Sequence, residues 1–408
     1  MTVPSPNAAL ARGALPMMAT AAGVTVANVY LCQPLLSAMA HDFHISSATA
    51  GWVATAAQVG YALGILLIVP LGDRADSKRL VRILMACACA ALVAAACAPT
   101  VYLLIAATLA LTMATVVPQI LIPLTVSNAA PERAGRVVGA MQSGLILGIL
   151  LSRTVSGTVG QYTGSWRNSY FLAAALTAVL FFALPRFMPE KRAAANATPM
   201  PYLQLLASLP TLLVRWNGLR LSAVLGACVF GAFSAFWATL AFHLAQPPFG
   251  YGSAQAGLFG LWGAAGALIA PFCGRLSDKY GPALLNTIAI GATLLAFAAF
   301  LGGGDVSVFA IVIGVNLLDF GNQSGQIANQ ARIFKLDPAA RARLNTVYMV
   351  ATFGGGALGS VIGSLAWSAG GWHGVCATGI GLVLLAALAL AGWTLFGRKA
   401  GRAPSSCV

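Results

Sequence analysis

Twelve long apolar runs divide this sequence, and they restrict the fold more than any other feature. A helix that crosses a bilayer needs about 20 mostly apolar residues, because each residue rises about 1.5 Å through a hydrocarbon core about 30 Å thick. Such runs lie near residues 14–38, 48–71, 80–98, 101–126, 137–160, 168–188, 218–244, 253–274, 283–302, 306–330, 344–368 and 372–396. The sequence therefore predicts an all-α membrane protein with twelve transmembrane helices.

The scarcity of charge excludes a water-soluble fold. Charged residues make up 8% of the 408 residues, whereas a soluble globular chain carries about 25%. The net charge of +14 would suit nucleic acid if the cations formed a surface patch. They fall instead in short clusters between the apolar runs, so we expect no nucleic-acid partner. The eight cysteines show no paired CxxC spacing, and we expect no disulfide, metal site or cofactor.

The basic residues mark one side of the membrane. All 23 Lys and Arg except Arg153 and Arg167 lie near the termini or in alternate loops, at 72–82, 131–136, 186–220, 275–279 and 332–343. Lys and Arg collect in cytoplasmic loops. We therefore expect a multi-pass protein of the cell (inner) membrane with both termini in the cytoplasm.

A polar stretch near 186–217 separates the sixth and seventh runs at the midpoint of the chain. The sequence thus predicts an N-terminal six-helix half at 1–188, a cytoplasmic linker at 189–217 and a C-terminal six-helix half at 218–408.

Two features recur at matching places in these halves. The loops after the second and eighth runs share an acidic residue followed by a basic one, at Asp73-Arg74 and at Asp278-Lys279. Closely spaced glycines recur in the fifth and eleventh runs, at Gly144, Gly148, Gly355, Gly359 and Gly363. The recurrence indicates that the two halves are related by duplication.

The repeated loops resemble the signature of the major facilitator superfamily, Gly-x-x-x-Asp-(Arg/Lys)-x-Gly-(Arg/Lys)-(Arg/Lys). The second copy matches at Gly274, Asp278, Lys279 and Gly281, whereas the first has Val69 and Asp76 where glycines are usual. The resemblance covers nearly the whole chain and implies two pseudo-symmetric six-helix bundles, the major facilitator fold, with transport by alternating access. It also implies a gating role for Asp73, Arg74, Lys78, Arg79, Gly274, Asp278 and Lys279.

Narrower likenesses to bacterial efflux-type members lie at residues 28–36, 150–157 and 341–348. They imply export of a small molecule by proton antiport. Drug antiporters have a proline where this chain has Ile149, and a basic residue in the fourth span that is missing from 101–126. A proton symporter or facilitative uniporter for a sugar or carboxylate is the alternative. The chain has no GxxxxGK[ST] P-loop, which excludes ATP hydrolysis by this polypeptide as the driving force.

Asp319 lies near the middle of the tenth run. A charge inside a membrane span costs about 2.5–3.5 kcal/mol on insertion scales, so it marks a functional candidate. Helical spacing places it in a polar stripe with Asn316, Gln323, Gln326 and Gln330. Lipid cannot satisfy amide groups, so the stripe should face a water-filled cavity or the other half. Asp319 would then carry the coupled proton, or else be held permanently by a basic or amide partner.

Arg153 is the second charge inside a run, on the side of the helix opposite Gly144. If the glycines pack against a neighbouring helix, Arg153 points elsewhere. It would then bind an anionic substrate or pair with Asp319, or its long stem would snorkel to the outer interface.

Polar and aromatic residues on several runs predict a mixed substrate pocket near the membrane midplane. The expected contacts with the substrate are Asn28, Tyr30, Gln33, Gln119, Arg153, Trp237, Asn316, Gln323, Gln326 and Tyr348. We expect the protein to act as a monomer with a small molecule and protons as its partners.

Two rival functions need other features. An intramembrane enzyme needs catalytic groups within a span, and the sequence has no HExxH or paired intramembrane Asp motif. We therefore expect no enzyme. A membrane receptor or sensor, which normally carries an appended soluble domain, is the alternative outside transport.

Overall fold

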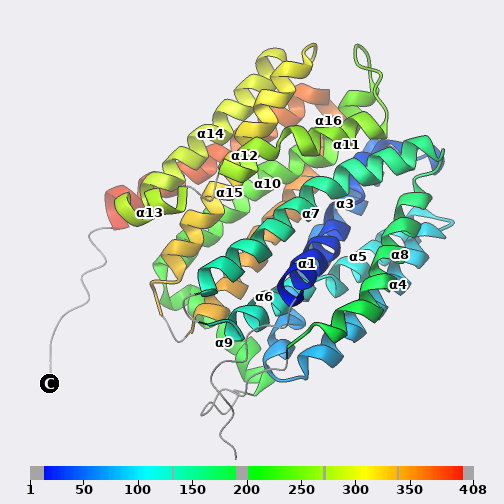
Figure 1. Ribbon diagram of the computed structural model, residues 1–408. Coiled ribbons are helices and arrows are strands. Elements are labelled where there is room, and N and C mark those ends of the chain that lie inside the picture. Colours follow the sequence, from blue (N-terminus) through cyan, green and yellow to red (C-terminus); the bar gives the residue numbers. More distant parts are fainter. Residues whose placement is uncertain (1–12, 131–132, 190–200, 270–272, 338–339, 398–408) are drawn as a thin grey trace, which may run out of the picture. The chain divides into compact units, whose positions relative to one another are not determined.

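The computed structural model describes residues 13–130, 133–189, 201–269, 273–337 and 340–397, apart from the side chains of Asp73, Arg275, Asp278 and a few other residues within these ranges. Every long element in this part of the chain is a helix (Figure 1). The chain divides into two compact units. Unit 1 comprises Met1–Leu206 and Leu240–Leu261, and unit 2 comprises Ala207–Thr239 and Trp262–Val408.

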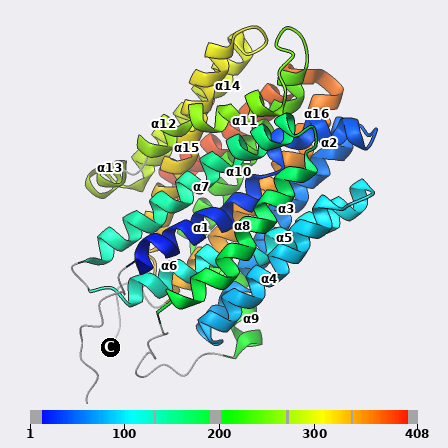
Figure 2. The ribbon, with the colours of Figure 1, turned by 45° about the vertical axis from the view of Figure 1, so that its right-hand side comes forward.

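The first six predicted spans all lie in unit 1. Their helices are α1 (Ala14–Tyr30), α2 (Leu36–Asp42), α3 (Ser47–Leu67), α4 (Ser77–Ala96), α5 (Val101–Ala114), α6 (Val117–Ser127), α7 (Ala134–Tyr162) and α8 (Arg167–Ala183). Two short 3₁₀ turns extend α3 and α8, at Val69–Asp73 and Leu184–Arg186. In both ribbon views α4 lies beside α5 and α8 (Figure 1, Figure 2).

The later spans follow an amphipathic helix. The helices are α9 (Tyr202–Arg215), α10 (Asn217–Ala245), α11 (Ser253–Trp262), α12 (Ala264–Ile269), α13 (Cys273–Tyr280), α14 (Pro282–Gly303), α15 (Val308–Ile333) and α16 (Arg341–Gly392). Figure 2 shows α14 alongside α15 within unit 2.

These helices account for the twelve predicted spans. In the described part of the chain, nine helices are long and apolar enough to cross a membrane. One of them, α16, holds the eleventh and twelfth spans, because Gly370 and Gly371 leave helical geometry; Gly371 has φ 56°, which favours glycine. The eighth span is α11 and α12, separated at Gly263, and the tenth is α15. The predicted all-α membrane protein with twelve transmembrane helices is confirmed.

Local sequence explains where several helices begin. The side chains of Ser46, Asp76, Thr100 and Ser307 each accept a hydrogen bond from a backbone N–H in the first turn of the helix that follows. These caps satisfy donors that have no partner within the helix. Pro34 lies in the 3₁₀ turn between α1 and α2, and Pro118 opens α6 after the fourth span is interrupted. Proline has no N–H to give, so it belongs at such points.

The glycines predicted to form seams do contact neighbouring helices. In unit 1, a Cβ on Gly23 of α1 would lie 2.5 Å from the carbonyl oxygen of Gly144 on α7. In unit 2, a Cβ on Gly231 of α10 would lie 2.9 Å from the carbonyl oxygen of Gly355 on α16. Only glycine allows backbones to approach this closely. The first and fifth spans therefore pack as the seventh and eleventh do.

The segment predicted as a polar linker contains a helix, α9, that the sequence analysis does not predict. Its Leu209 and Leu212 are buried, and the Tyr202 hydroxyl donates a 2.8 Å hydrogen bond to the carbonyl of Leu67. The division into compact units cuts the chain inside α9 and α10 as well as after Leu261. The halves predicted at 1–188 and 218–408 follow the sequence repeat, and they stay a prediction.

Candidate functional site

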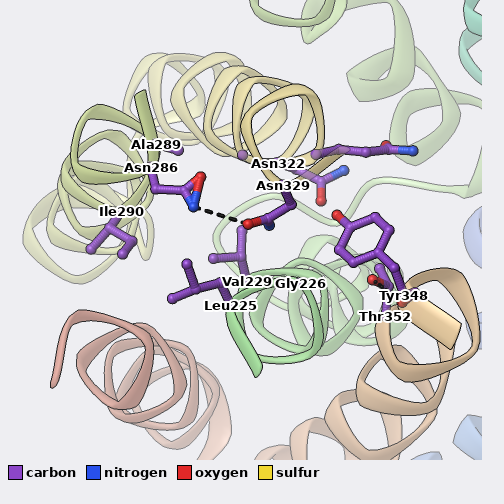
Figure 3. A pocket seen from close by; sticks show the side chains of 12 residues that line it. Leu225, Gly226, Val229, Asn286, Ala289, Ile290, Asn322, Asn329, Tyr348 and Thr352 are labelled. Carbon is purple, nitrogen blue, oxygen red and sulfur yellow. Dashed lines mark hydrogen bonds between the residues drawn. The ribbon is translucent and has the colours of Figure 1, made fainter. Parts of the chain in front are cut away.

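A small cavity with both polar and apolar walls lies inside unit 2, between α10, α14, α15 and α16. Its volume is about 20 Å³, which is room for about one water molecule. Figure 3 shows Asn286, Asn322, Asn329 and Tyr348 around it, with apolar residues of α10 on another side. Asn322, Gln326 and Asn329 all reach the cavity because residues three and four apart share one face of a helix.

A hydrogen-bond network joins this cavity to a buried guanidinium. The Asn329 Oδ1 atom accepts from Asn286 Nδ2 at 2.9 Å and from Arg332 Nη1 at 3.0 Å (Figure 3 draws the first). Arg332 Nη1 also donates to Ser222 Oγ at 3.0 Å, and only 9% of the Arg332 residue is exposed. Among the described residues, Arg332 has no carboxylate partner, and its Nη2 atom has no hydrogen-bond acceptor. Neutral oxygens alone hold this buried cation.

Part of this pocket coincides with the predicted substrate contacts. Gln326 and Tyr348 were expected to contact substrate, and both line the cavity. Arg332 was counted with the cytoplasmic loop at 332–343, but it lies in the last turn of α15 and is buried. The spacing of Asn322, Gln326 and Asn329 is the signal that points to this cavity, because these residues widen the predicted stripe to the neighbouring face of α15.

Two residues of that stripe lie instead against the interruption in the eighth span. Asn316 Nδ2 donates to the carbonyl of Trp262 at 2.7 Å, and Asn316 Oδ1 accepts from the N–H of Gly266 at 3.1 Å. One side chain thus satisfies backbone groups on both sides of Gly263. The carboxylate of Asp319 packs directly on Gly263, where a Cβ would collide with its Oδ2 atom. Asp319 is 6% exposed and lies in the middle of α15.

The rest of the stripe has separate neighbours. Gln330 Nε2 donates to Asn345 Oδ1 at 3.3 Å, and Gln326 Nε2 lies 3.9 Å from Met349 Sδ. Gln323 is half-buried. The stripe therefore borders α16 and α12 rather than a single cavity within unit 2.

Arg153 forms the corresponding polar centre in unit 1. Its Nε atom donates to Gln33 Oε1 at 2.7 Å, and its guanidinium lies 5.0 Å from the centre of the Tyr30 ring. The residue is 1% exposed, so its side chain does not snorkel to the interface. The structure thus joins three of the predicted substrate contacts, Tyr30, Gln33 and Arg153. Asp319 belongs to the other unit, and its pairing with Arg153 stays a prediction.

The remaining predicted contacts are dispersed. Gln119 Nε2 donates to the Tyr61 hydroxyl at 3.3 Å. Asn28 is buried on α1, with 4% exposed. Trp237 packs among aromatic rings on α10, 5.4 Å from Phe236 and 6.1 Å from Phe233 between ring centres. Their predicted contact with substrate is not tested by these positions.

Arg167, the other basic residue outside the basic loops, has a structural explanation. It forms an ion pair with Asp42, and it donates to the carbonyl of Ala98 at 3.2 Å. The Trp166 Nε1 atom donates to the same Asp42 carboxylate at 3.0 Å. Arg167, at the start of the sixth span, is therefore joined to the end of the first span through the Asp42 carboxylate.

The predicted gating loops are described in part. The side chains of Asp73 and Asp278 lie outside the described residues, as does the environment of Gly274. Arg74 and Arg79 are exposed, Lys78 is half-buried, and the ammonium of Lys279 lies 5.0 Å from the ring centre of Tyr280. A cap explains the departure from the signature at Asp76, because its Oδ1 atom accepts from the Arg79 N–H at 2.7 Å and caps α4.

Comparison with known proteins gives relatives along almost the whole chain. An uncharacterized transporter, YgaY of Escherichia coli O157:H7, is 40% identical over 380 residues, covering 93% of this chain and 95% of its own. "Probable transporter SCO4007" of Streptomyces coelicolor is 38% identical, covering 95% and 88%. "Probable nitrate/nitrite transporter NarK2" of Mycobacterium tuberculosis is 30% identical, covering 71% and 73%.

Solved structures share the fold at low sequence identity. The nucleoside transporter NupG has a TM-score of 0.71 at 17% identity, covering 94% of this chain and 98% of that chain. A bacterial homologue of the human lysosomal transporter Spinster has a TM-score of 0.74 at 15% identity, covering 96% and 98%.

Residues 18–331 match the profile of the Major Facilitator Superfamily. The matched segment includes both signature loops and most of the spans that form the two polar centres. The relatives that span nearly the whole chain are named as transporters, and the matched family is one of transporters and not of enzymes. This chain belongs to the Major Facilitator Superfamily.

Proposed function

We propose that this transporter exports a small molecule in exchange for protons, and that Asp319 carries the coupled proton. A membrane transporter of a small molecule is what the family membership establishes. The direction, the coupling and the cytoplasmic placement of both termini are the proposal. The observation that carries it is the position of Asp319, a buried carboxylate in the middle of α15.

The surroundings of Asp319 support such a role. A carboxyl group inside a membrane span is costly in its charged form and less so when protonated. Its neighbour across the helix interface is Gly263, at the interruption between α11 and α12. Broken helices are found at binding and coupling sites of transporters, where irregular backbone lines a cavity. A change of charge on Asp319 would therefore act directly at the interruption of the eighth span.

A second candidate, transport of a small anion, is favoured by one specific observation. Arg153 and Arg332 are buried guanidinium groups, and a guanidinium is suited to binding a carboxylate or another anion. The name of the Mycobacterium tuberculosis relative refers to nitrate and nitrite. A carboxylate or inorganic anion moved by symport or uniport is thus the alternative substrate class.

The test uses the purified protein in proteoliposomes that contain a pH-sensitive dye. Nucleosides, sugars, carboxylates, nitrate and lipophilic cations are screened for substrate-dependent proton flux, with the wild type beside Asp319→Asn. We expect proton flux to disappear in the variant while substrate binding remains. The matched control is Asp305→Asn, because Asp305 lies in the turn between α14 and α15, with its Oδ2 atom 3.6 Å from His373 Nε2, and should not affect coupling.

Equal proton flux in wild type and Asp319→Asn would reject Asp319 as the carrier. Substrate movement without any proton flux would replace antiport by facilitated diffusion. Flux of nitrate or a carboxylate in the same direction as protons would favour the anion alternative.

A further inference from the structure

An open groove of about 610 Å³ lies in unit 1 between the start of α4 and the end of α8. One side of the groove consists of Lys78, Arg79 and Arg82. The other side is apolar and includes Phe181 and Pro185. The groove belongs neither to the polar centre around Arg153 nor to the cavity of unit 2.

The groove carries an excess of positive charge. Its one acidic residue is Asp76, whose Oδ1 atom is engaged by the backbone N–H of Arg79 at the start of α4. In the described part of the chain, no side-chain hydrogen bond or ion pair involves Lys78, Arg79 or Arg82. The guanidinium of Arg82 lies 5.7 Å from the centre of the Phe181 ring, which supports it from the apolar side.

The apolar side continues along the outer surfaces of the two helices. Ile83 of α4 is 50% exposed, and on α8 Phe182 and Val179 are 68% and 65% exposed. Both helices are long and apolar enough to cross a membrane. The cations therefore lie at the level where a span begins, and the exposed apolar residues lie at the level of the acyl chains.

We propose that this groove binds an anionic phospholipid, with its phosphate groups on Lys78, Arg79 and Arg82 and its acyl chains along Ile83 and Phe182. Basic pockets between helices on the cytoplasmic side are typical sites for cardiolipin headgroups. Three cations against one engaged carboxylate match a lipid with two phosphates better than one with a single phosphate. A free phosphate ion would gain nothing from the apolar wall, so the occupant is a lipid.

The test measures lipid retention by native mass spectrometry of the full-length protein. Protein is exchanged into mixed micelles that contain cardiolipin, phosphatidylglycerol or phosphatidylcholine, and the bound lipid is counted. We expect cardiolipin to be retained over phosphatidylglycerol and both over phosphatidylcholine. Arg82→Gln should weaken cardiolipin binding about fivefold, the effect of about 1 kcal/mol per basic residue near a charged surface.

Matched variants separate this groove from general basicity. Arg136→Gln removes an exposed basic residue at the start of α7, and it should retain cardiolipin like the wild type. Arg82→Lys keeps the charge and should also retain it. If Arg82→Gln does not yield a monodisperse protein, Lys78→Gln tests the same groove, and it should also weaken cardiolipin retention.

Three outcomes would overturn the proposal. One is equal retention of cardiolipin and phosphatidylcholine by the wild type. Another is an equal loss of cardiolipin from Arg82→Gln and Arg136→Gln. The third is displacement of the lipid by millimolar inorganic phosphate, which would make the groove a site for a free anion.

Discussion

Among the described residues, each unit buries one guanidinium, and the two are held in different ways. Arg153 lies within the long helix α7, where a glutamine of α1 accepts its hydrogen bond and a tyrosine ring faces its charge. Arg332 lies in the last turn of α15, where a serine and an asparagine accept from it. The carbonyl end of a helix carries partial negative charge, which stabilises a cation there. Arg332 thus lies at a helix end that stabilises its charge, whereas Arg153 lies within a span beside Tyr30 and Gln33, two other predicted substrate contacts, and is the stronger candidate for a substrate contact.

We expect the largest effect from a substitution that separates α1 from α7, the two helices that build the polar centre around Arg153 in unit 1. Gly148→Leu would drive a side chain into the backbone of Gly23 on α1, the helix that carries Tyr30 and Gln33. We expect a loss of more than about 4 kcal/mol, as for the most damaging core substitutions, and little monodisperse protein by size-exclusion chromatography. Gly139→Leu on the same helix is the control, because nothing lies within 4 Å of a Cβ there. A Gly148→Leu protein that melts like the control would contradict close packing at this seam.

Replacing each guanidinium by an apolar chain tests its role in transport. Arg153→Met should lower the rate of substrate uptake into proteoliposomes by about 10- to 100-fold, since a hydrogen bond to a charged group contributes about 1.5–3 kcal/mol. Arg332→Met should lower it less than tenfold, because the interactions recorded for Arg332 stay within unit 2. A larger loss of uptake in Arg332→Met than in Arg153→Met would indicate that the substrate contacts the cavity of unit 2 instead.

The smallest expected effects are losses of stability from substitutions in the hydrogen-bond network around Arg332. Asn329→Leu removes the acceptor shared by Asn286 and Arg332 and should cost about 2–3 kcal/mol, because it leaves a buried donor without a partner. Asn286→Leu removes only one of these hydrogen bonds and should cost about 1 kcal/mol. Thermal unfolding of the two variants in detergent gives the order. Equal costs would mean that the network is not centred on Asn329.

The sequence predicts the spans because hydrophobic length is a local property. The twelve runs, the closely spaced glycines of the fifth and eleventh runs, and the unusual position of Arg153 can each be recognised from residues within one helix. The resemblance adds the duplicated halves and the family, and the family is confirmed. Of the predicted substrate contacts, Tyr30, Gln33 and Arg153 come together in unit 1, and Gln326 and Tyr348 come together in unit 2.

What the sequence does not reveal depends on partners far apart in the chain. The burial of Arg332 requires Ser222, which lies 110 positions away, and nothing near Arg332 distinguishes it from a loop cation. The interruption of the eighth span at Gly263 requires Asn316 from α15, because a lone glycine does not end a helix by itself. Arg167 is explained only by Asp42 from another loop.

That interruption has a mechanical consequence. A continuous helix resists bending because each turn is bonded to the next, and a break in the ladder removes that resistance at one point. Here the break lies at Gly263, between helix α11 of 10 residues and helix α12 of 6 residues. The two hydrogen bonds of Asn316, to the carbonyl of Trp262 and from the N–H of Gly266, join the two helices across this break. Bending of the eighth span at Gly263 would therefore disturb the hydrogen bonds of the Asn316 side chain and leave the backbone hydrogen bonds within α11 and α12 in place.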